Sequence, residues 1–237
     1  MINYDLLTSE AKKLGIDLGE YGADRFDTYA ERLVRWNEHI NLTAITEPDD
    51  IVIKHFIDSL YIMKYVNFKE GEQIADVGTG AGFPGLPLLF ANPETVDVTF
   101  VDSSGKRIGF IKDVLNNTGL IARRVHERAE ILGKDPEFRE RFDYATARAV
   151  APLNVLCEYC LPLVKVGGLF VSLKGSSGMQ ELESAKNAIE ILGGEVARAE
   201  EYSLPNGDGR SIIIIRKVSQ TPTKYPRKSK KIDTKPL

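Results

Sequence analysis

Residues 76–85 are Asp-Val-Gly-Thr-Gly-Ala-Gly-Phe-Pro-Gly, a glycine-rich stretch that follows an apolar run and precedes a helical pattern. Glycine has no Cβ atom, so a loop of this composition can turn sharply and lie close to a ligand. In an open α/β sheet, ligands bind in the crevice at the carboxyl ends of the strands. The stretch therefore predicts an α/β fold with a ligand site at the end of its first strand.

The glycine spacing bears on the kind of ligand. The dinucleotide-binding fingerprint Gly-x-Gly-x-x-Gly would require glycine at the position of Phe83, so the match fails there. The form Asp-x-Gly-x-Gly-x-Gly instead resembles motif I of class I methyltransferases. We therefore expect S-adenosylmethionine as the cofactor, with Gly78 and Gly80 close to it. A nicotinamide-dependent dehydrogenase is the alternative from a different enzyme class.

Short apolar runs alternate with helical patterns after residue 72, which predicts βαβ units and a mostly parallel sheet. The expected strands cover residues 73–78, 96–102, 142–150 and 167–175, with a weaker candidate at 122–128. The expected helices cover residues 86–92, 106–119, 151–164 and 180–194. Residues 195–205 and 210–218 have no helix between them and are joined by Asn-Gly-Asp-Gly, which predicts an antiparallel hairpin at the sheet edge. That ending is typical of methyltransferases rather than dehydrogenases.

The N-terminal part has a different pattern. Apolar side chains recur at helical spacing over residues 24–39 and 49–66, which predicts two amphipathic helices. We expect a helical extension at residues 1–68, a Rossmann-like methyltransferase core at 69–218 and a basic tail at 219–237, within a single domain overall.

Composition excludes several classes of protein. Hydrophobic residues make up 43% and charged residues 27% of the 237, as in ordinary globular proteins. The absence of a long apolar run or a secretory signal pattern predicts a cytoplasmic protein that does not enter a membrane. Cys157 and Cys160 lie in an apolar helical run with no histidine beside them, so we expect a buried helix and no metal.

Charge is distributed unevenly. Residues 216–237 hold eight Lys or Arg and one acid, Asp233, so their net charge is +7 and residues 1–215 carry −10. A basic tail on an acidic body suits contact with a polyanion. A disordered terminus that only aids solubility explains the same charge, and composition does not separate the two.

Three polar side chains are expected at the carboxyl edge of the sheet. Asp102 ends the second predicted strand, where a carboxylate can accept hydrogen bonds from two ribose hydroxyls, although it could instead cap the next helix. Glu130 follows the weaker strand, where an adenine would lie, but taken by itself it is better explained as an acid at a helix start. Arg148 ends the strand at 142–150, where its guanidinium could pair with a carboxylate or a phosphate.

Several blocks in order along nearly the whole chain resemble one family. They include Trp36-Asn37, Asn41-Leu42-Thr43, the segment 55–60, the loop 76–88, the segment 125–130, Phe142-Asp143, Ala147-Arg148-Ala149, Leu173-Lys174-Gly175 and Tyr225-Pro226-Arg227. In these blocks the chain resembles the 16S ribosomal RNA guanine-N7 methyltransferases, the ribosomal RNA small subunit methyltransferase G or glucose-inhibited division protein B family. The resemblance implies methyl transfer from S-adenosylmethionine to N7 of a guanine in 16S RNA or the small ribosomal subunit. It also implies cofactor contact by Gly78, Phe83, Val101, Asp102, Ser103, Ala129, Glu130 and Arg148.

Guanine N7 carries a free lone pair, so we expect no catalytic base and catalysis by positioning. The candidates for RNA contact are Arg123, Arg124, Arg128, Tyr225, Arg227 and Lys228. Arg123 and Arg124 are equally explained as a solvated strand edge. Lys174 is expected on the substrate side. His55 and Asp58 share a helix face and could line the site or fix the helical extension onto the core.

Two further interpretations of the sequence stay open. A small-molecule methyltransferase would fit the acidic body, and a ribosome-binding module without activity could keep the same fold. The partner that we expect is 16S RNA or the small subunit, and neither DNA nor a membrane, with the protein acting as a monomer.

Overall fold

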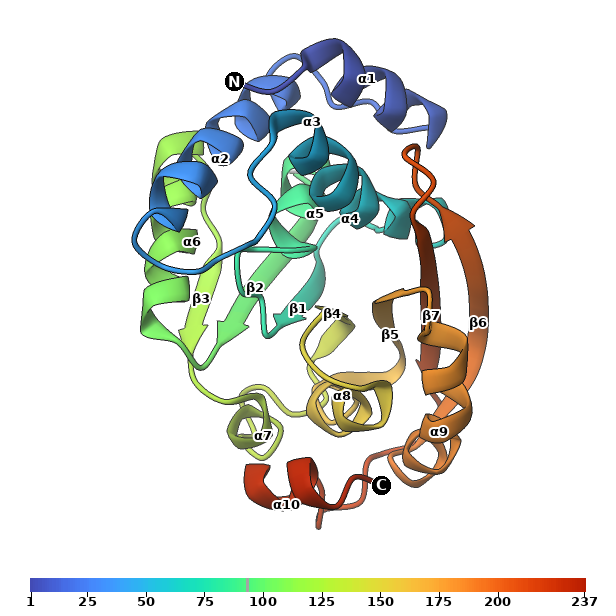
Figure 1. The fold of residues 1–237 in the computed structure, drawn as a ribbon. Helices are drawn as coiled ribbons and strands as arrows, with labels where there is room; N and C mark the ends of the chain where they lie inside the picture. The colour runs from blue at the N-terminus through green and yellow to red at the C-terminus, as the bar shows by residue number, and fades with distance from the viewer. Residues whose placement is uncertain (93) are drawn as a thin grey trace.

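A seven-stranded sheet forms the centre of the computed structural model, which describes residues 1–92 and 94–237 (Figure 1). The strands are β1 Glu72–Val77, β2 Val96–Asp102, β3 Arg123–His126, β4 Phe142–Arg148, β5 Val164–Gly175, β6 Gly194–Ser203 and β7 Gly209–Lys217. Their order is β3-β2-β1-β4-β5-β7-β6, and β7 runs antiparallel to both β5 and β6. The predicted parallel sheet with a terminal antiparallel hairpin is confirmed.

Helices cover both faces of this sheet (Figure 1). One group contains α1 Tyr4–Lys13, α2 Gly22–Asn37, α3 Pro48–Ile51, α4 Asp58–Leu60, α5 Gly85–Ala91 and α6 Gly105–Thr118. The other contains α7 Ala129–Leu132, α8 Leu153–Cys160, α9 Gly178–Ile191 and α10 Ser229–Thr234. Alternate residues of β1 enter different cores, Ile74 with the first group and Ala75 with the second. The strand is therefore buried on both faces, as its continuous apolar sequence predicts.

The predicted helix at residues 49–66 is present, but its geometry changes along its length. Its middle, Val52–Ile57, forms a π-helix (η1), and its end, Tyr61–Lys64, forms a 3₁₀-helix (η2), on either side of α4. Helical spacing in a sequence assumes 3.6 residues per turn, so it does not distinguish these variants. π-Helical turns are rare and occur often at functional sites, and η1 contains His55.

The chain's single tryptophan joins the N-terminal helices to the core. The Trp36 indole N–H donates to Asp113 Oδ2 at 2.8 Å, and Arg32 Nε donates to the same oxygen at 2.7 Å. Trp36 packs against the core and is partly exposed, because its polar edge lies at this junction between α2 and α6.

The basic C-terminal segment folds back onto α8, so the alternative of a disordered terminus is wrong. Ile232 of α10 is fully buried, and Tyr225 retains 7% of its accessible surface. At the base of the segment, Lys217 donates to Leu161 O and to Thr221 Oγ1 and pairs with Glu140 at 3.1 Å. These contacts hold the segment in a defined conformation.

The two cysteines lie on α8 and are both fully buried, which confirms the predicted buried helix. Burial raises the pKa of both thiols, so they stay protonated near neutral pH. Residues 1–92 and 94–237 contain no group of three or more His, Cys, Asp or Glu placed to hold a metal ion. Over the same ranges, no helix has the length and apolarity to cross a bilayer.

Candidate active site at the carboxyl ends of the strands

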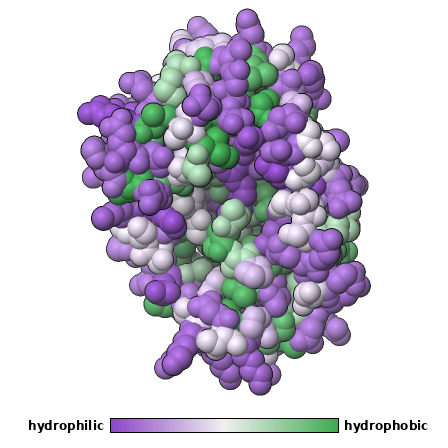
Figure 2. Space-filling model, in the orientation of Figure 1, coloured by the Kyte–Doolittle hydropathy of each residue, from purple (hydrophilic) through white to green (hydrophobic). Residues whose placement is uncertain are grey.

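A cavity of about 470 Å³ lies at the carboxyl ends of β1, β2 and β4. All nine residues predicted to contact a cofactor line it, namely Gly78, Gly80, Phe83, Val101, Asp102, Ser103, Ala129, Glu130 and Arg148. They come from four separate segments of the chain and meet because parallel strands end at one edge of the sheet. Figure 2 shows this face of the molecule hollowed near its middle, with less polar residues in the hollow and polar residues around it.

The glycine loop forms one wall of the cavity. Gly78 and Gly80 have φ angles of +65° and +56°, a region that strains other residues. The Asp76 carboxylate stabilises the loop, because it accepts hydrogen bonds from Thr79 Oγ1 at 2.5 Å and from the Gly85 amide at 3.2 Å. Burial raises the pKa of Asp76 to about 6, against these hydrogen bonds. Asp76 therefore supports the loop rather than facing the ligand.

Asp102 connects the loop to the second strand. Its Oδ2 accepts from the Gly80 amide at 2.9 Å, and its Oδ1 accepts from the Ser104 amide at 2.8 Å. The N-cap residue of α6 is Ser104, so the alternative that Asp102 caps this helix is wrong. Oδ2 also lies 3.5 Å from Arg107 Nη1, and Oδ1 keeps acceptor capacity for a further donor, such as a ribose hydroxyl.

Glu130 lies in the first turn of α7 and is 8% exposed, with its carboxylate 4.0 Å from Arg128 Nη1. The position of Glu130 agrees with both predictions, since it lies at the start of a helix and also lines the cavity.

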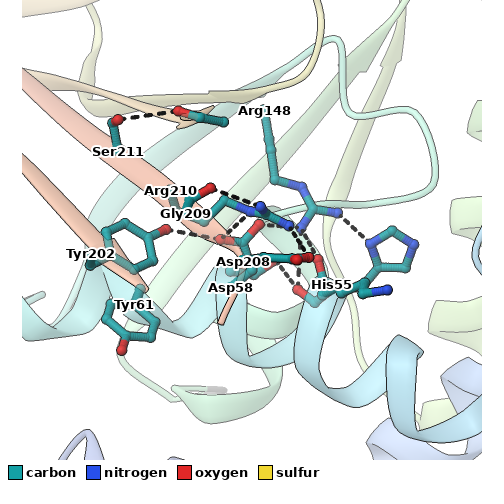
Figure 3. Close-up of polar contacts among 12 residues, drawn as sticks. His55, Asp58, Tyr61, Arg148, Tyr202, Asp208, Gly209, Arg210 and Ser211 are labelled. Carbon is teal, nitrogen blue, oxygen red and sulfur yellow. Dashed lines mark hydrogen bonds and ion pairs between the residues drawn. The ribbon is translucent and has the colours of Figure 1, made fainter. Parts of the chain in front are cut away.

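The guanidinium of Arg148 is held by residues of the N-terminal helices (Figure 3). Its Nη1 lies 3.0 Å from Asp58 Oδ2, and its Nη2 donates to His55 Nδ1 at 3.0 Å. The group also stacks over the Phe83 ring, 4.4 Å from the centroid. Arg148 therefore pairs with a carboxylate of the protein itself, at the boundary of the cavity.

Asp58 is 3% exposed and connects this arginine to the terminal hairpin. Its Oδ1 accepts from the Tyr202 hydroxyl at 2.9 Å and lies 3.6 Å from Arg210 Nε (Figure 3). The contacts favour the structural alternative for His55 and Asp58, in which they fix the helical extension to the core. His55 also lines the cavity.

His55 is held in one neutral form. Its Nδ1 accepts from Arg148, so Nε2 carries the proton and donates to Thr43 Oγ1 at 2.8 Å. Its ring also stacks on Phe83 with centroids 4.3 Å apart. Burial first, and then the positive charge of Arg148, lower the pKa of His55 to about 3.

This lowered pKa predicts a loss of stability in acid. An unfolded histidine binds a proton below its ordinary pKa of 6.5, whereas the folded His55 does not until about 3. The contribution of the neutral His55 to the free energy of unfolding is therefore present above pH 6.5 and is lost as the pH falls towards 3. Between about pH 7 and pH 4.5, the free energy of unfolding of the wild type should fall by roughly 2–3 kcal/mol more than that of His55→Gln. Urea unfolding at several pH values measures this, and His39→Gln, at an exposed histidine, is the control. Parallel curves for wild type and His55→Gln would contradict the assignment.

A second cavity, of about 540 Å³, adjoins the first. The two share His55, Arg148, Ala149 and Val150 in their linings. Lys174, predicted on the substrate side, lies in this second cavity, where its Nζ donates to Ala151 O at 2.5 Å and pairs with Glu181 Oε2 at 2.8 Å. Sequence reasoning missed Glu181, because it reaches the cavity from the first turn of α9 and no motif marks it. It also missed Tyr159 and Arg107 in the first cavity.

The family model described as GidB, rRNA small subunit methyltransferase G, matches residues 23–212. The chain belongs to this family.

Relatives named ribosomal RNA small subunit methyltransferase G occur in Thermoanaerobacter sp., at 46% identity over 98% of both chains, and in Acetivibrio thermocellus, at 47% identity over 98% of this chain and 96% of the relative. Among solved structures, a branched-chain polyamine synthase mutein from Thermus thermophilus has a TM-score of 0.57 at 10% identity, covering 81% of this chain and 64% of that one. TrmN from Thermus thermophilus has a TM-score of 0.50 at 18% identity, covering 70% and 53%. At these identities the structures support the fold alone.

In this member of the rRNA small subunit methyltransferase G family, two residues predicted to contact RNA are engaged elsewhere. Tyr225 is buried, so its ring cannot stack on a base, and that prediction is wrong. Arg227 forms a fork with Glu158, with Nε 2.9 Å from Oε1 and Nη2 2.6 Å from Oε2. The Glu158 side chain is 1% exposed, so Arg227 neutralises a buried charge, and its contact with RNA phosphate stays a prediction.

The other basic residues predicted to contact RNA are exposed on the surface of this member of the rRNA small subunit methyltransferase G family. Arg123 pairs with Glu137 and covers the Phe138 ring, whereas the Arg124 guanidinium donates to Ala122 O. Arg128 lies at the rim of the first cavity, and Lys228 immediately precedes α10. Their role in RNA contact stays a prediction.

Proposed function

We propose that this protein transfers the methyl group of S-adenosylmethionine to N7 of a guanine in 16S ribosomal RNA. The observation that carries the proposal is that nine residues predicted for one cofactor line one cavity in a chain of the rRNA small subunit methyltransferase G family. The proposal includes a monomer that acts in the cytoplasm, on RNA and not on DNA or a membrane.

The shape of the first cavity fits the cofactor. A Cβ atom at Gly78 would lie 2.8 Å from a methyl carbon of Val150, which lines the same cavity, so any larger residue at position 78 would displace this part of the wall. Gly78 and Gly80 would lie against the methionine part, Asp102 would accept from the ribose hydroxyls, and Ala129 with Glu130 would contact the adenine. When bound, S-adenosylmethionine supplies an electrophilic methyl group on a sulfonium.

The residues around the cavity have to position the reactants rather than move protons. Guanine N7 carries its lone pair without deprotonation, so the transfer needs no general base. His55 is neutral and is hydrogen-bonded at both ring nitrogens, and Arg148 is paired with Asp58. These groups form a rigid wall for the acceptor, and we assign no catalytic residue.

Transfer of a radiolabelled methyl group tests the proposal. Small subunits from cells that lack the protein, and 16S RNA extracted from them, are incubated with protein and labelled S-adenosylmethionine, and the labelled base is mapped. We expect one labelled guanine, modified at N7. Label in a metabolite instead would favour a small-molecule methyltransferase. Calorimetry without heat from S-adenosylmethionine would favour a binding module without activity.

The exposed Lys228 gives a test of the RNA surface. Lys228→Ala should weaken binding to the small subunit and lower the slope of log affinity against log salt by about one, because one phosphate contact is lost. Cofactor affinity should not change, because Lys228 does not line the first cavity. Lys13→Ala is the control, since α1 and α10 lie at opposite ends of the molecule (Figure 1). An unchanged slope in Lys228→Ala would remove this residue from the RNA surface.

A further inference from the structure

The second cavity is suited to a purine base, and its charges are placed to distinguish guanine from adenine. We propose that the target guanine enters this cavity and that the pair formed by Lys174 and Glu181 recognises its O6 and N1–H. The inference rests on the proposed function and names the residues that determine its specificity.

The position of the cavity supports this assignment. On the side that faces the first cavity, the second cavity is lined by Ala149 and Val150, which line both cavities. Ala149 has a φ angle of +55°, which is strained for a residue with a side chain and is typical of functional sites. A base in the second cavity would therefore lie beside the place where the methyl group is presented. A volume of about 540 Å³ leaves room for a purine and part of its ribose.

N7 alone cannot select guanine, because adenine has the same lone pair at N7. The two purines differ at positions 6 and 1, where guanine has an acceptor, O6, beside a donor, N1–H. Adenine presents the reverse, a donor amino group beside the acceptor N1. A site that selects guanine therefore needs a donor and an acceptor side by side, in that order.

Lys174 and Glu181 provide this arrangement. Their charged groups are 2.8 Å apart, and the Lys174 side chain is 6% exposed. The ammonium has three N–H donors, and it uses two of them on Ala151 O and Glu181. Glu181 Oε2 also accepts from the Leu153 amide at 2.8 Å, whereas Oε1 has only a 3.5 Å contact with the Ser177 hydroxyl. One donor and one acceptor thus remain for the base.

The other charged groups of this cavity are already engaged. Both oxygens of Asp58 have partners, Arg148 and Tyr202. Arg210 lies between Asp58 and Asp208, and Lys54 pairs with Asp50 at 3.0 Å. The pair at Lys174 and Glu181 is therefore the one best able to accept a new partner.

Replacement of the Glu181 carboxylate with an amide tests the inference. Small subunits are reconstituted with 16S RNA that carries either guanine or adenine at the mapped position, and the two rates of methyl transfer are compared as a ratio. We expect the wild type to prefer guanine by at least about 100-fold. Glu181→Gln should lower this ratio by about 10-fold or more, because an amide can rotate to present either a donor or an acceptor.

Two measurements make the result specific. Calorimetry should give the same affinity of Glu181→Gln for S-adenosylmethionine as the wild type. Glu183→Gln, an exposed position of the same helix that pairs with Lys186, should keep the wild-type ratio. If Glu181→Gln does not fold, Lys174→Gln gives the same test from the other side of the pair.

The possible failures can be told apart. An unchanged ratio in a folded, cofactor-binding Glu181→Gln would overturn the inference and leave the proposed function intact. A wild-type protein that binds S-adenosylmethionine and methylates neither subunit would overturn the proposed function, and the inference with it.

Discussion

The replacement of Gly78 with valine is expected to abolish cofactor binding, with a loss of affinity of at least about 100-fold. At a φ angle of +65°, a β-branched residue is strongly strained, and its Cβ would lie within 2.9 Å of both Val150 methyl carbons. Displacement of Val150, which lines the cavity, would distort the wall beside which we place the methionine part of the cofactor. Calorimetric titration of the folded variant with S-adenosylmethionine measures the effect.

Gly71→Val separates steric exclusion from backbone strain. Gly71 has a φ angle of +78°, but a Cβ there would meet no atom within 4 Å, and it precedes β1 at the end away from the cavity. This control should lose stability through strain and keep its affinity for the cofactor. Tight binding by Gly78→Val would show that the ligand does not lie against this loop.

The second large effect is expected from Asp58→Ala. Removal of this carboxylate leaves the Arg148 guanidinium and the Tyr202 hydroxyl without their partner in a buried setting. Loss of one member of a buried ion pair costs about 3–5 kcal/mol, because the remaining charge is uncompensated. Urea unfolding should show a decrease of this size in the free energy of unfolding.

Glu183→Ala is the control for Asp58→Ala, since it breaks an ion pair whose two side chains are more than 60% exposed. Exposed pairs of this kind contribute about 0–1 kcal/mol. A similar, small effect of both substitutions would mean that Asp58 does not hold the N-terminal helices, β4 and the terminal hairpin together.

The sheet and the first cavity could be predicted because their signals are local. The glycine loop, Asp102 and Arg148 each lie at or just after the end of an apolar run. Parallel strands bring such ends to one edge, so the residues meet without any knowledge of long-range contacts. The antiparallel hairpin was predictable for a similar reason, since an Asn-Gly turn between two strands leaves no room for a crossover.

The tail could not be predicted, because the partner of each charge is set by the fold. Arg227 meets Glu158, 69 residues earlier in the sequence, and nothing near either residue indicates the contact. The basic residues of the tail therefore include Arg227, which pairs with a buried carboxylate, and others, such as Lys228, that face solvent. Their number alone does not distinguish the two kinds. Glu181 was missed for the same reason, since only the packing of α9 against α8, β6 and β7 places it in a cavity.

The junction at Trp36 provides an optical probe that needs no labelling. Because the chain has one tryptophan, selectively excited emission comes from a single indole between α2 and α6. Circular dichroism, by contrast, reports on the backbone as a whole. If the two signals change at the same denaturant concentration, the first helices and the sheet unfold as one cooperative unit. If the emission changes earlier, the helices detach first.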